Sequence, residues 1–167
     1  MYGEKRIAVV VPAHNEERLI GRTLGTMPSF VDRIIVVDDA STDRTSQVVK
    51  DAAVQDPRVL ALRHDGNRGV GAAIITGYKK AVELEMDVTS VMAGDGQMDP
   101  GDLADVIEPV VQGKADYTKG NRLFQGDAWS MIPHTRYLGN SFLSLLTKIA
   151  SGYWHVADSQ SGYTAVS

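Results

Sequence analysis

Acidic residues stand at the ends of two apolar runs in this sequence. One run, residues 34–37, leads into Asp38 and Asp39, and the other, residues 88–92, leads toward Asp95. Runs of this kind are typical of strands buried on both faces of a parallel sheet, and open α/β sheets bind ligands at the carboxyl ends of their strands. Carboxylates there can hydrogen-bond a base or ribose, or approach a divalent ion on a diphosphate. The two signatures therefore predict opposite ends of one nucleotide-sugar site.

The adjacent residues Asp38 and Asp39 are expected to have different roles. Neighbouring residues of an extended chain point in different directions, and a single helix cap needs only one carboxylate. We therefore assign base or ribose contact to Asp39. Asp43, two residues beyond Ser41, is expected to support the start of the following helix.

Asp95 and Gln97 form the candidate metal site. They stand two residues apart, so both side chains fall on one side of an extended segment and both can offer oxygen to one ion. Mg²⁺ or Mn²⁺ suits such ligands. A turn that opens a helix explains the neighbouring Asp99 and Pro100 but leaves Asp95 and Gln97 unexplained.

Two loops supply further candidates for binding the nucleotide. The first strand breaks at Pro12, and the loop that follows can present backbone amides and a carboxylate, although an ordinary turn capped by Asn15 is an equal alternative. In the loop that contains Arg68 and Gly69, free amides at a helix start favour an anion and Arg68 adds charge. Small residues, Ala72 and Ala73, follow. Glycine spacing alone more often marks a turn.

Residues further along the chain could serve a second substrate. Arg122 and Arg136 can each hold a phosphate through the planar guanidinium, although surface arginines are usually only solvated. Asp158 lies before Gly162, and a carboxylate beside a tight turn suits a general base, with a structural turn as the alternative.

The elements that position these residues alternate along the chain. Strand-like runs at 7–11, 34–37, 59–62 and 88–92 alternate with helical spacing at 16–27, 43–53, 69–84 and 102–111, and a short strand is expected at 115–118. This alternation predicts βαβ units in an α/β fold. Helix starts are expected at Asn15, at Ser41 and Thr42, and at Pro100.

The pattern changes after Gly120. Residues 121–134 indicate a loop, residues 137–149 carry an apolar stripe, and strand character returns near Gly162. The stripe fits core packing, with a membrane surface as the alternative. We expect one domain over residues 1–167, truncated at its carboxyl terminus.

Composition narrows the function classes. A chain of 167 residues fits one domain, and its 17 basic and 21 acidic residues give a net charge of −4, which argues against a nucleic-acid partner. There is no cysteine, so disulfides and thiolate metal sites are excluded, in agreement with a reducing compartment. The start does not resemble a signal peptide, and no apolar run approaches the roughly 18 residues of a membrane span.

Seven motifs in this order resemble the inverting glycosyltransferases of family 2, and most closely the dolichyl- or polyprenyl-phosphate sugar synthases. They are residues 11–17, 37–41, 67–69, 94–97 and 120–122, Arg136 with Gly139 and Asn140, and residues 158–163. The resemblance implies a GT-A (Rossmann-like) fold, with a mostly parallel central sheet flanked by helices. It also implies inverting transfer of a sugar from a nucleoside diphosphate, UDP or GDP, to a lipid phosphate.

The resemblance also implies roles for particular residues. Asp95 with Gln97 would hold the metal, Mg²⁺ or Mn²⁺, and the diphosphate, while Arg122 and Arg136 would hold the acceptor phosphate. Asp158 matches an acidic residue near the acceptor. The implied nucleotide-sugar site comprises Pro12, Ala13, Glu16, Asp39, Arg68, Gly69, Asp95 and Gly96. We expect a cytoplasmic protein at the cytoplasmic face of a membrane, because the implied acceptor is a lipid.

Two departures from the family pattern bear on chemistry. Ala93 stands where many relatives carry the first carboxylate of Asp-X-Asp, which puts strict metal use in question. Thr164 follows Tyr163 where many dolichyl-phosphate mannose synthases have Arg, which favours glucosyl or another sugar over mannosyl transfer.

Two alternatives stay open at this point. A transferase acting on a polysaccharide or another hydroxyl acceptor would need Asp158 as base and would show a limb in its pH–rate profile. An inactive nucleotide-sugar-binding module is the alternative from a different class, suggested by Ala93 and by the end of the chain at Ser167.

Overall fold

The computed structural model describes residues 1–96, 98–120, 149 and 162–167. Almost all of these belong to one compact unit, formed by Met1–Thr118 and Tyr163–Ser167. A second unit spans Lys119–Gly162.

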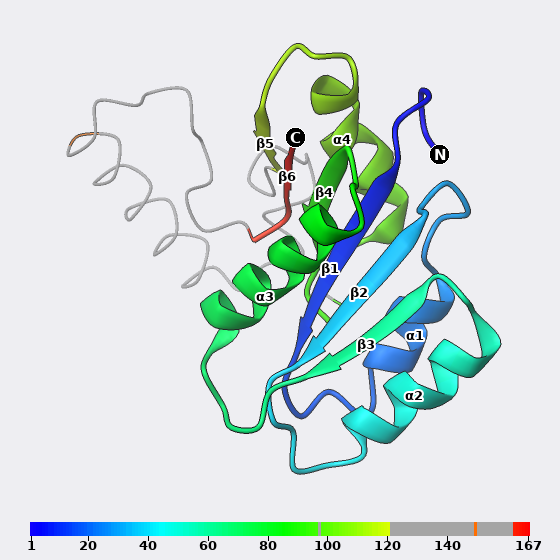
Figure 1. Ribbon diagram of the computed structural model, residues 1–167, viewed down its shortest axis with the longest axis vertical. Helices are drawn as coiled ribbons and strands as arrows, with labels where there is room; N and C mark the ends of the chain where they lie inside the picture. Colours follow the sequence, from blue (N-terminus) through cyan, green and yellow to red (C-terminus); the bar gives the residue numbers. More distant parts are fainter. Residues whose placement is uncertain (97, 121–148, 150–161) are drawn as a thin grey trace, which may run out of the picture. The chain divides into compact units, whose positions relative to one another are not determined.

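A mostly parallel sheet forms the centre of this unit (Figure 1). Its strands are β1 (Ile7–Ala13), β2 (Arg33–Asp38), β3 (Val59–Arg63), β4 (Val88–Val91), β5 (Tyr117–Lys119) and β6 (Thr164–Val166). The order is β3-β2-β1-β4-β6-β5, with β1 to β4 parallel and β6 antiparallel to β4. The predicted α/β architecture is therefore confirmed, including the return to strand structure after Gly162.

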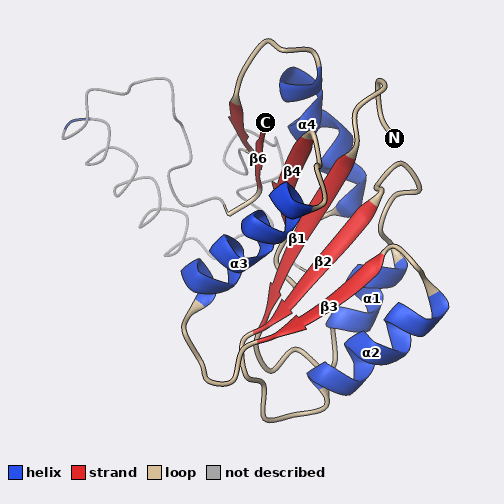
Figure 2. Ribbon diagram, in the orientation of Figure 1, coloured by secondary structure: helices blue, strands red, loops and turns tan. Residues whose placement is uncertain are grey.

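Helices cover both faces of the sheet (Figure 2). They are α1 (Ile20–Gly25), α2 (Thr45–Gln55), α3 (Val70–Glu83) and α4 (Leu103–Val111), the last preceded by a 3₁₀ turn at Pro100–Asp102. Residues of α1, α2 and α4 share one buried cluster with alternate residues of β1, whereas α3 packs on the other face. Among the helices that the structure describes, none is long and apolar enough to cross a membrane.

Side-chain alternation along β1 explains the two layers. Val9 and Val11 belong to the cluster of α1, α2 and α4, and Val10 belongs to the cluster of α3. All three are fully buried, as expected for a central parallel strand. Gly77 of α3 lies directly against Val10, because a methyl group at Gly77 would overlap the valine side chain. The close approach of α3 to β1 therefore requires glycine at position 77.

Two of the three predicted helix starts need correction. Helix α1 begins at Ile20 rather than near Glu16, and Asn15 is no cap: its φ of 57° places it in the left-handed region. Helix α2 begins at Thr45, whose N–H donates to Asp43 Oδ1 at 2.9 Å. The predicted role of Asp43 is therefore confirmed, while Ser41 and Thr42 precede the helix. The third helix start is as expected beside Pro100: Asp99 caps the 3₁₀ turn before α4 by accepting a hydrogen bond from the Gly101 N–H.

Candidate active site

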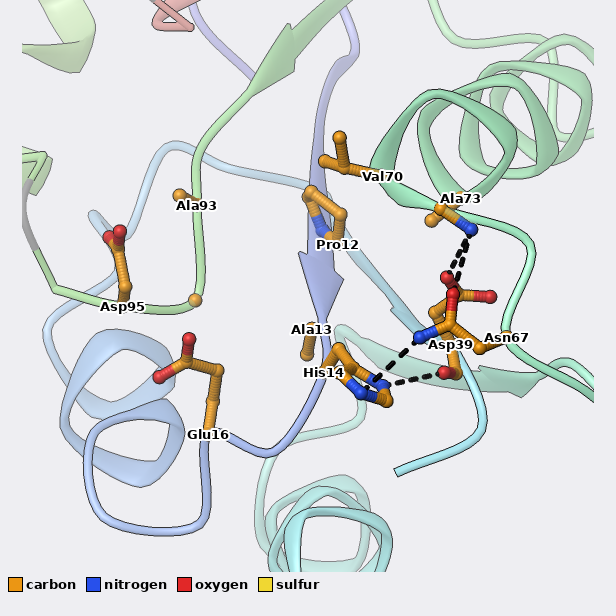
Figure 3. Close-up of a pocket in the computed structure, with 12 residues that line it drawn as sticks. Pro12, Ala13, His14, Glu16, Asp39, Asn67, Val70, Ala73, Ala93 and Asp95 are labelled. Atoms are coloured by element: carbon orange, nitrogen blue, oxygen red, sulfur yellow. Dashed lines mark hydrogen bonds between the residues drawn. The ribbon is translucent and has the colours of Figure 1, made fainter. Parts of the chain in front are cut away.

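A cavity of about 310 Å³ opens where β1, β2, β3 and β4 end, within the size range of small-molecule sites (Figure 3). Loops after all four parallel strands contribute, as the rule for open α/β sheets requires. Its lining consists of Pro12, Ala13, His14, Glu16, Asp39, Asn67, Gly69, Val70, Ala73, Ala93, Gly94 and Asp95. The structure thus brings together six predicted residues: Pro12, Ala13, Glu16, Asp39, Gly69 and Asp95.

Asp38 and Asp39 have different surroundings, as predicted for adjacent residues at the end of a strand, and the ligand contact of Asp39 stays a prediction. Asp38 is only 2% exposed and serves the scaffold: Oδ1 accepts from the Ser41 N–H at 2.9 Å, and Oδ2 accepts from Arg63 at 2.8 Å. Asp39 instead lines the cavity. The turn between them and α2 passes through Ala40, which adopts a left-handed φ of 55°.

The Asp39 carboxylate accepts three hydrogen bonds from residues that the structure describes. Oδ1 accepts from the Arg68 N–H at 2.9 Å and from His64 Nδ1 at 2.7 Å, and Oδ2 accepts from the Gly69 N–H at 2.7 Å. Burial raises the pKa of this carboxyl, but the Arg68 backbone, His64 and the Gly69 backbone together outweigh burial and hold the pKa below its ordinary value. Asp39 is therefore an ionised acceptor at neutral pH.

This geometry revises the expectation of an open anion site at the start of α3. The N–H groups of Arg68 and Gly69 already bind an anion, and that anion is the Asp39 carboxylate. Gly69 has a φ of 86°, which requires glycine. Arg68 is exposed and contributes its backbone to the site, so a role for its guanidinium on a ligand stays a prediction.

His14 joins the two loops that border Asp39. Nδ1 lies 2.8 Å from the Asp39 carbonyl oxygen, which can only accept, so Nδ1 carries a proton. Nε2 faces the amide nitrogens of Asn15 at 3.1 Å and Asn67 at 3.3 Å, which fits an acceptor. The arrangement indicates a neutral imidazole protonated at Nδ1. Figure 3 shows this ring beside Asp39 and Asn67, with dashed lines for its hydrogen bonds.

The loop after β1 is braced against the loop after β2, and this bracing positions Glu16. The N–H of Asn15 donates to Ser41 Oγ at 3.0 Å, and the N–H of Glu16 donates to Thr45 Oγ1 at 2.7 Å. The N–H of Glu17 donates to Asp43. These three bonds replace a regular helix start with a fixed loop, which accounts for the late beginning of α1.

Glu16 and Asp95 lie on one side of Pro12 in the cavity, and Asp39 lies on the other (Figure 3). The pKa of Glu16 is raised, first by burial and then by the negative charges of Asp95 and Asp43. The carboxylate oxygens at this end of the cavity are the ligand type that Mg²⁺ and Mn²⁺ prefer, so the residues present fit a divalent cation. Within the described part of the chain, no group of three acidic or histidine residues forms a complete metal site.

Gly94 and Gly96 bring the loop after β4 close to α1. A methyl group at Gly94 would approach Ile20 Cδ1 to 2.9 Å, and Gly96 has a left-handed φ of 69°. Gly96 does not line the main cavity but borders a neighbouring hollow with Arg22, Thr23 and Thr26. Its role in donor binding stays a prediction.

Several predicted residues lie outside the part of the chain that the structure describes. They are Gln97, Arg122, Arg136 and Asp158, together with the apolar stripe of residues 137–149 apart from Ile149. Tyr163, next to that part, is buried, and its hydroxyl donates to the Asp99 carbonyl at 3.3 Å. The residue after the predicted Ser-Gly-aromatic motif, Thr164, begins β6.

Sequence reasoning missed His64, which lies immediately after β3 and contacts Asp39. Its position in the sequence indicated a place near the site, because residue 64 directly follows β3 as Asp39 directly follows β2, and parallel strands end at one edge of the sheet. Nothing in residue type, however, distinguished His64 from the other histidines. The contributions of His14 and Asn67 to the cavity were also not predicted, although both stand in the motifs of the two loops.

Comparison with known proteins agrees with this geometry. The model of glycosyl transferase family 2 matches residues 8–166. A UDP-N-acetylglucosamine–dolichyl-phosphate N-acetylglucosaminyltransferase of Methanococcus voltae is 36% identical over 98% of this chain and 70% of its own length. An undecaprenyl-phosphate mannosyltransferase of Micrococcus luteus is 32% identical over 96% of this chain and 65% of its own length.

A solved structure shares the fold. Glucosyl-3-phosphoglycerate synthase of Mycobacterium tuberculosis, in complex with Mn²⁺, UDP and glucosyl-3-phosphoglycerate, superposes with a TM-score of 0.72 at 20% identity. The match covers 98% of this chain and 57% of that protein, and it supports the GT-A-like assignment of the α/β architecture. With the family match over nearly its whole length, the chain is a member of glycosyltransferase family 2.

Proposed function

We propose that this chain is the donor-binding and catalytic part of an enzyme that transfers a sugar from a nucleoside-diphosphate sugar to a polyprenyl or dolichyl phosphate, with inversion. The observation that carries the proposal is one cavity bordered by an ionised Asp39 at one end and by Asp95 at the other. The relatives named for dolichyl and undecaprenyl phosphate support the acceptor class.

Asp39 would read the nucleoside. An ionised carboxylate can only accept, so it selects an N–H of a base or a hydroxyl of ribose. Pro12, Ala13 and Val70 provide apolar surface for the flat base, and the small Ala73 lets it come close. Hydrogen bonds within the protein already fix the Asp39 side chain, so little conformational entropy is lost when the donor binds.

Asp95, with Gln97, would hold Mg²⁺ or Mn²⁺ on the donor diphosphate. When bound, such an ion neutralises the negative charge that grows on the leaving diphosphate. Glu16 adds negative potential at this end of the cavity. Mn²⁺ accompanies UDP in the Mycobacterium tuberculosis enzyme, which supports the same arrangement here.

The reaction itself follows from inversion. An oxygen of the acceptor phosphate attacks the anomeric carbon from the face opposite the diphosphate, a new C–O bond forms, and the bond to the diphosphate breaks. A phosphate monoester is largely ionised at neutral pH, so the attack needs no proton-removing base. Arg122 and Arg136 are proposed to hold this phosphate, and Asp158 to lie beside it. We propose that the enzyme acts at the cytoplasmic face of a membrane, where it would meet a lipid acceptor.

The test is sugar transfer by the full-length protein to a short-chain polyprenyl phosphate in detergent. UDP-N-acetylglucosamine, UDP-glucose and GDP-mannose are compared, each with Mn²⁺, Mg²⁺ or EDTA. The proposal predicts a metal-dependent glycolipid from one donor and an opposite anomeric configuration in the product. Transfer only to a hydroxyl acceptor, with an acidic limb in the pH–rate profile, would contradict the lipid-phosphate assignment. Donor binding without transfer or donor hydrolysis would indicate a binding module.

A further inference from the structure

We propose that His64 is a positioning residue for the donor site, which orients the Asp39 carboxylate by tying it to α3 through Thr76. The inference rests on the function proposed above and adds a residue to it. His64 lies outside the residues that line the cavity, so it acts through Asp39 rather than on the ligand.

The three side chains form a continuous hydrogen-bonded chain. His64 Nδ1 lies 2.7 Å from Asp39 Oδ1, and His64 Nε2 lies 2.9 Å from Thr76 Oγ1. His64 and Asp39 are 7% and 3% exposed. The chain therefore joins three elements, since Asp39 follows β2, His64 follows β3, and Thr76 lies within α3.

The direction of the bond between His64 and Asp39 follows from chemistry. The ionised Asp39 carboxylate can only accept, so Nδ1 of His64 is the protonated nitrogen facing it. Nε2 of His64 is hydrogen-bonded to the Thr76 hydroxyl, a group that can both donate and accept. Thr76 thereby fixes the plane of the His64 ring, in the way that second hydrogen bonds orient histidines at functional sites.

The bonds also determine which acceptor position of Asp39 stays open to a ligand. Each carboxylate oxygen can accept about two hydrogen bonds. Oδ1 accepts two, from His64 and Arg68, whereas Oδ2 accepts one, from Gly69, among the described residues. With the bond from His64, Oδ1 accepts as many hydrogen bonds as it can. The ligand is therefore expected to bind Oδ2, whose remaining acceptor position suits one N–H or O–H donor of the nucleoside.

A purely structural role would not need this chemistry. The space beneath Asp39 could be filled by an apolar side chain, and burying an imidazole costs free energy unless both nitrogens are paired. Both nitrogens of His64 are paired. A histidine at this position is explained if its function is to orient the Asp39 carboxylate and not only to fill space in the core.

The experiment compares two pairs of variants in the full protein. His64→Leu removes the donor to Asp39, whereas His64→Asn keeps an N–H at nearly the position of Nδ1. Thr76→Val removes the hydroxyl that orients His64, whereas Thr76→Ser keeps it. Calorimetric titration measures the Kd of UDP and GDP with Mn²⁺ on the folded protein, steady-state assays give donor KM and kcat, and thermal melts report stability separately.

We expect His64→Leu to raise the nucleotide Kd at least about 10-fold, since a hydrogen bond to a charged group is lost. His64→Asn should recover most of this affinity. Thr76→Val should raise Kd about 3-fold or more, Thr76→Ser should stay within about 2-fold of the parent, and Thr76→Val should add nothing in the His64→Leu background. Donor KM should rise more than kcat falls.

Equal Kd values, within about 2-fold, for the parent and a folded His64→Leu protein would overturn the inference even if melting temperatures differ. If His64→Leu does not fold, the Thr76 pair decides: equal affinities for Thr76→Val and Thr76→Ser would overturn the inference as well. If the parent protein transfers sugar and the variants bind nucleotide with the same Kd as the parent, only the role of His64 is refuted. A parent that binds no nucleotide refutes the proposed function itself.

Discussion

Oδ2 of Asp39 accepts a 2.7 Å hydrogen bond from the backbone N–H of Gly69, which lies 30 positions further along the chain. The carboxylate that follows β2 thus occupies the anion-binding end of α3. This contact joins two loops of the cavity and keeps Asp39 ionised. Its functional consequence is an acceptor that is fixed before the donor arrives.

Replacing Asp39 tests that consequence directly. Asp39→Asn should raise the Kd for the nucleotide at least about 10-fold, because a charged acceptor is lost and the new amide N–H groups face the N–H donors of Arg68 and Gly69. Isothermal titration with UDP and GDP measures the effect. Asp51→Asn, at an exposed position of α2, serves as the matched control and should bind like the parent. Unchanged affinity of a folded Asp39→Asn protein would remove Asp39 from the donor site.

Glycine at position 69 should be required for the backbone contact. Gly69→Ala forces a side chain onto a residue with a φ of 86°, which costs about 1–2 kcal/mol of stability, and any relaxation moves the N–H away from Asp39. Gly71→Ala lies two residues further on, in the first turn of α3, with open space around its new methyl group. It should be neutral or stabilising by up to about 1 kcal/mol. Urea unfolding compares the two, and equal stabilities would contradict the strain argument.

Acid should unfold the protein through its hydrogen-bonded carboxylates. The pKa values of Asp38, Asp39 and Asp43 lie below their ordinary value of 3.8, because hydrogen bonds to the ionised forms outweigh burial. Groups with lowered pKa values contribute stability that is complete above pH 3.8 and is lost as the pH falls through the folded-state values. Urea midpoints measured at pH 6, 4 and 3 should therefore drop most steeply between pH 4 and 3. Midpoints that stay constant over that interval would contradict this account.

Glu16 should have the opposite effect on stability. Its pKa is raised above the ordinary 4.5 by burial and by Asp95 and Asp43, so stability falls as the pH rises from 4.5 through the folded-state value. Glu16→Gln should therefore melt higher than the parent at pH 7.5 and nearly equally at pH 4. It should also gain less stability from Mn²⁺ with UDP, because a negative charge near the cation is lost.

The control for that prediction is Glu83→Gln, an exposed position at the end of α3 that pairs only with Lys80 among the described residues. It should melt within a degree or two of the parent at both pH values, since surface ion pairs contribute little. A Glu16→Gln protein that melts like Glu83→Gln at pH 7.5 would show that the charges of Asp95 and Asp43 do not destabilise Glu16.

The sequence predicted the sheet well because a buried parallel strand needs apolar residues on both faces. Residues 34–37 are all apolar and β-branched, which is typical of such a strand. Because the strands are parallel, Asp39 and Asp95 lie at the same edge of the sheet. The different surroundings of Asp38 and Asp39 also followed from local geometry, because adjacent side chains of a strand diverge. The scaffold contacts of Asp38 were not predicted.

The start of α1 and the role of His64 could not be predicted for a common reason. Asn15 resembles a cap in sequence, but the hydroxyls of Ser41 and Thr45, distant in the chain, bind the backbone N–H groups of Asn15 and Glu16 and hold a loop there. His64 likewise acquires its role from Asp39 and Thr76. Contacts across loops depend on the folded arrangement, which no local pattern specifies.

We propose that the cavity between Asp39 and Asp95 binds a nucleoside diphosphate together with a divalent cation. The most direct measurement is a calorimetric titration of the full protein with UDP and with GDP, each in Mn²⁺, Mg²⁺ or EDTA, and the same titrations of Asp39→Asn and Asp95→Asn. We expect selective binding of one nucleotide to the parent, with a Kd that is at least about 10-fold higher for Asp39→Asn in every condition. Asp95→Asn should lose only the part of the affinity that depends on metal. If neither nucleotide binds the parent protein in any of the three conditions, the cavity is not a donor site.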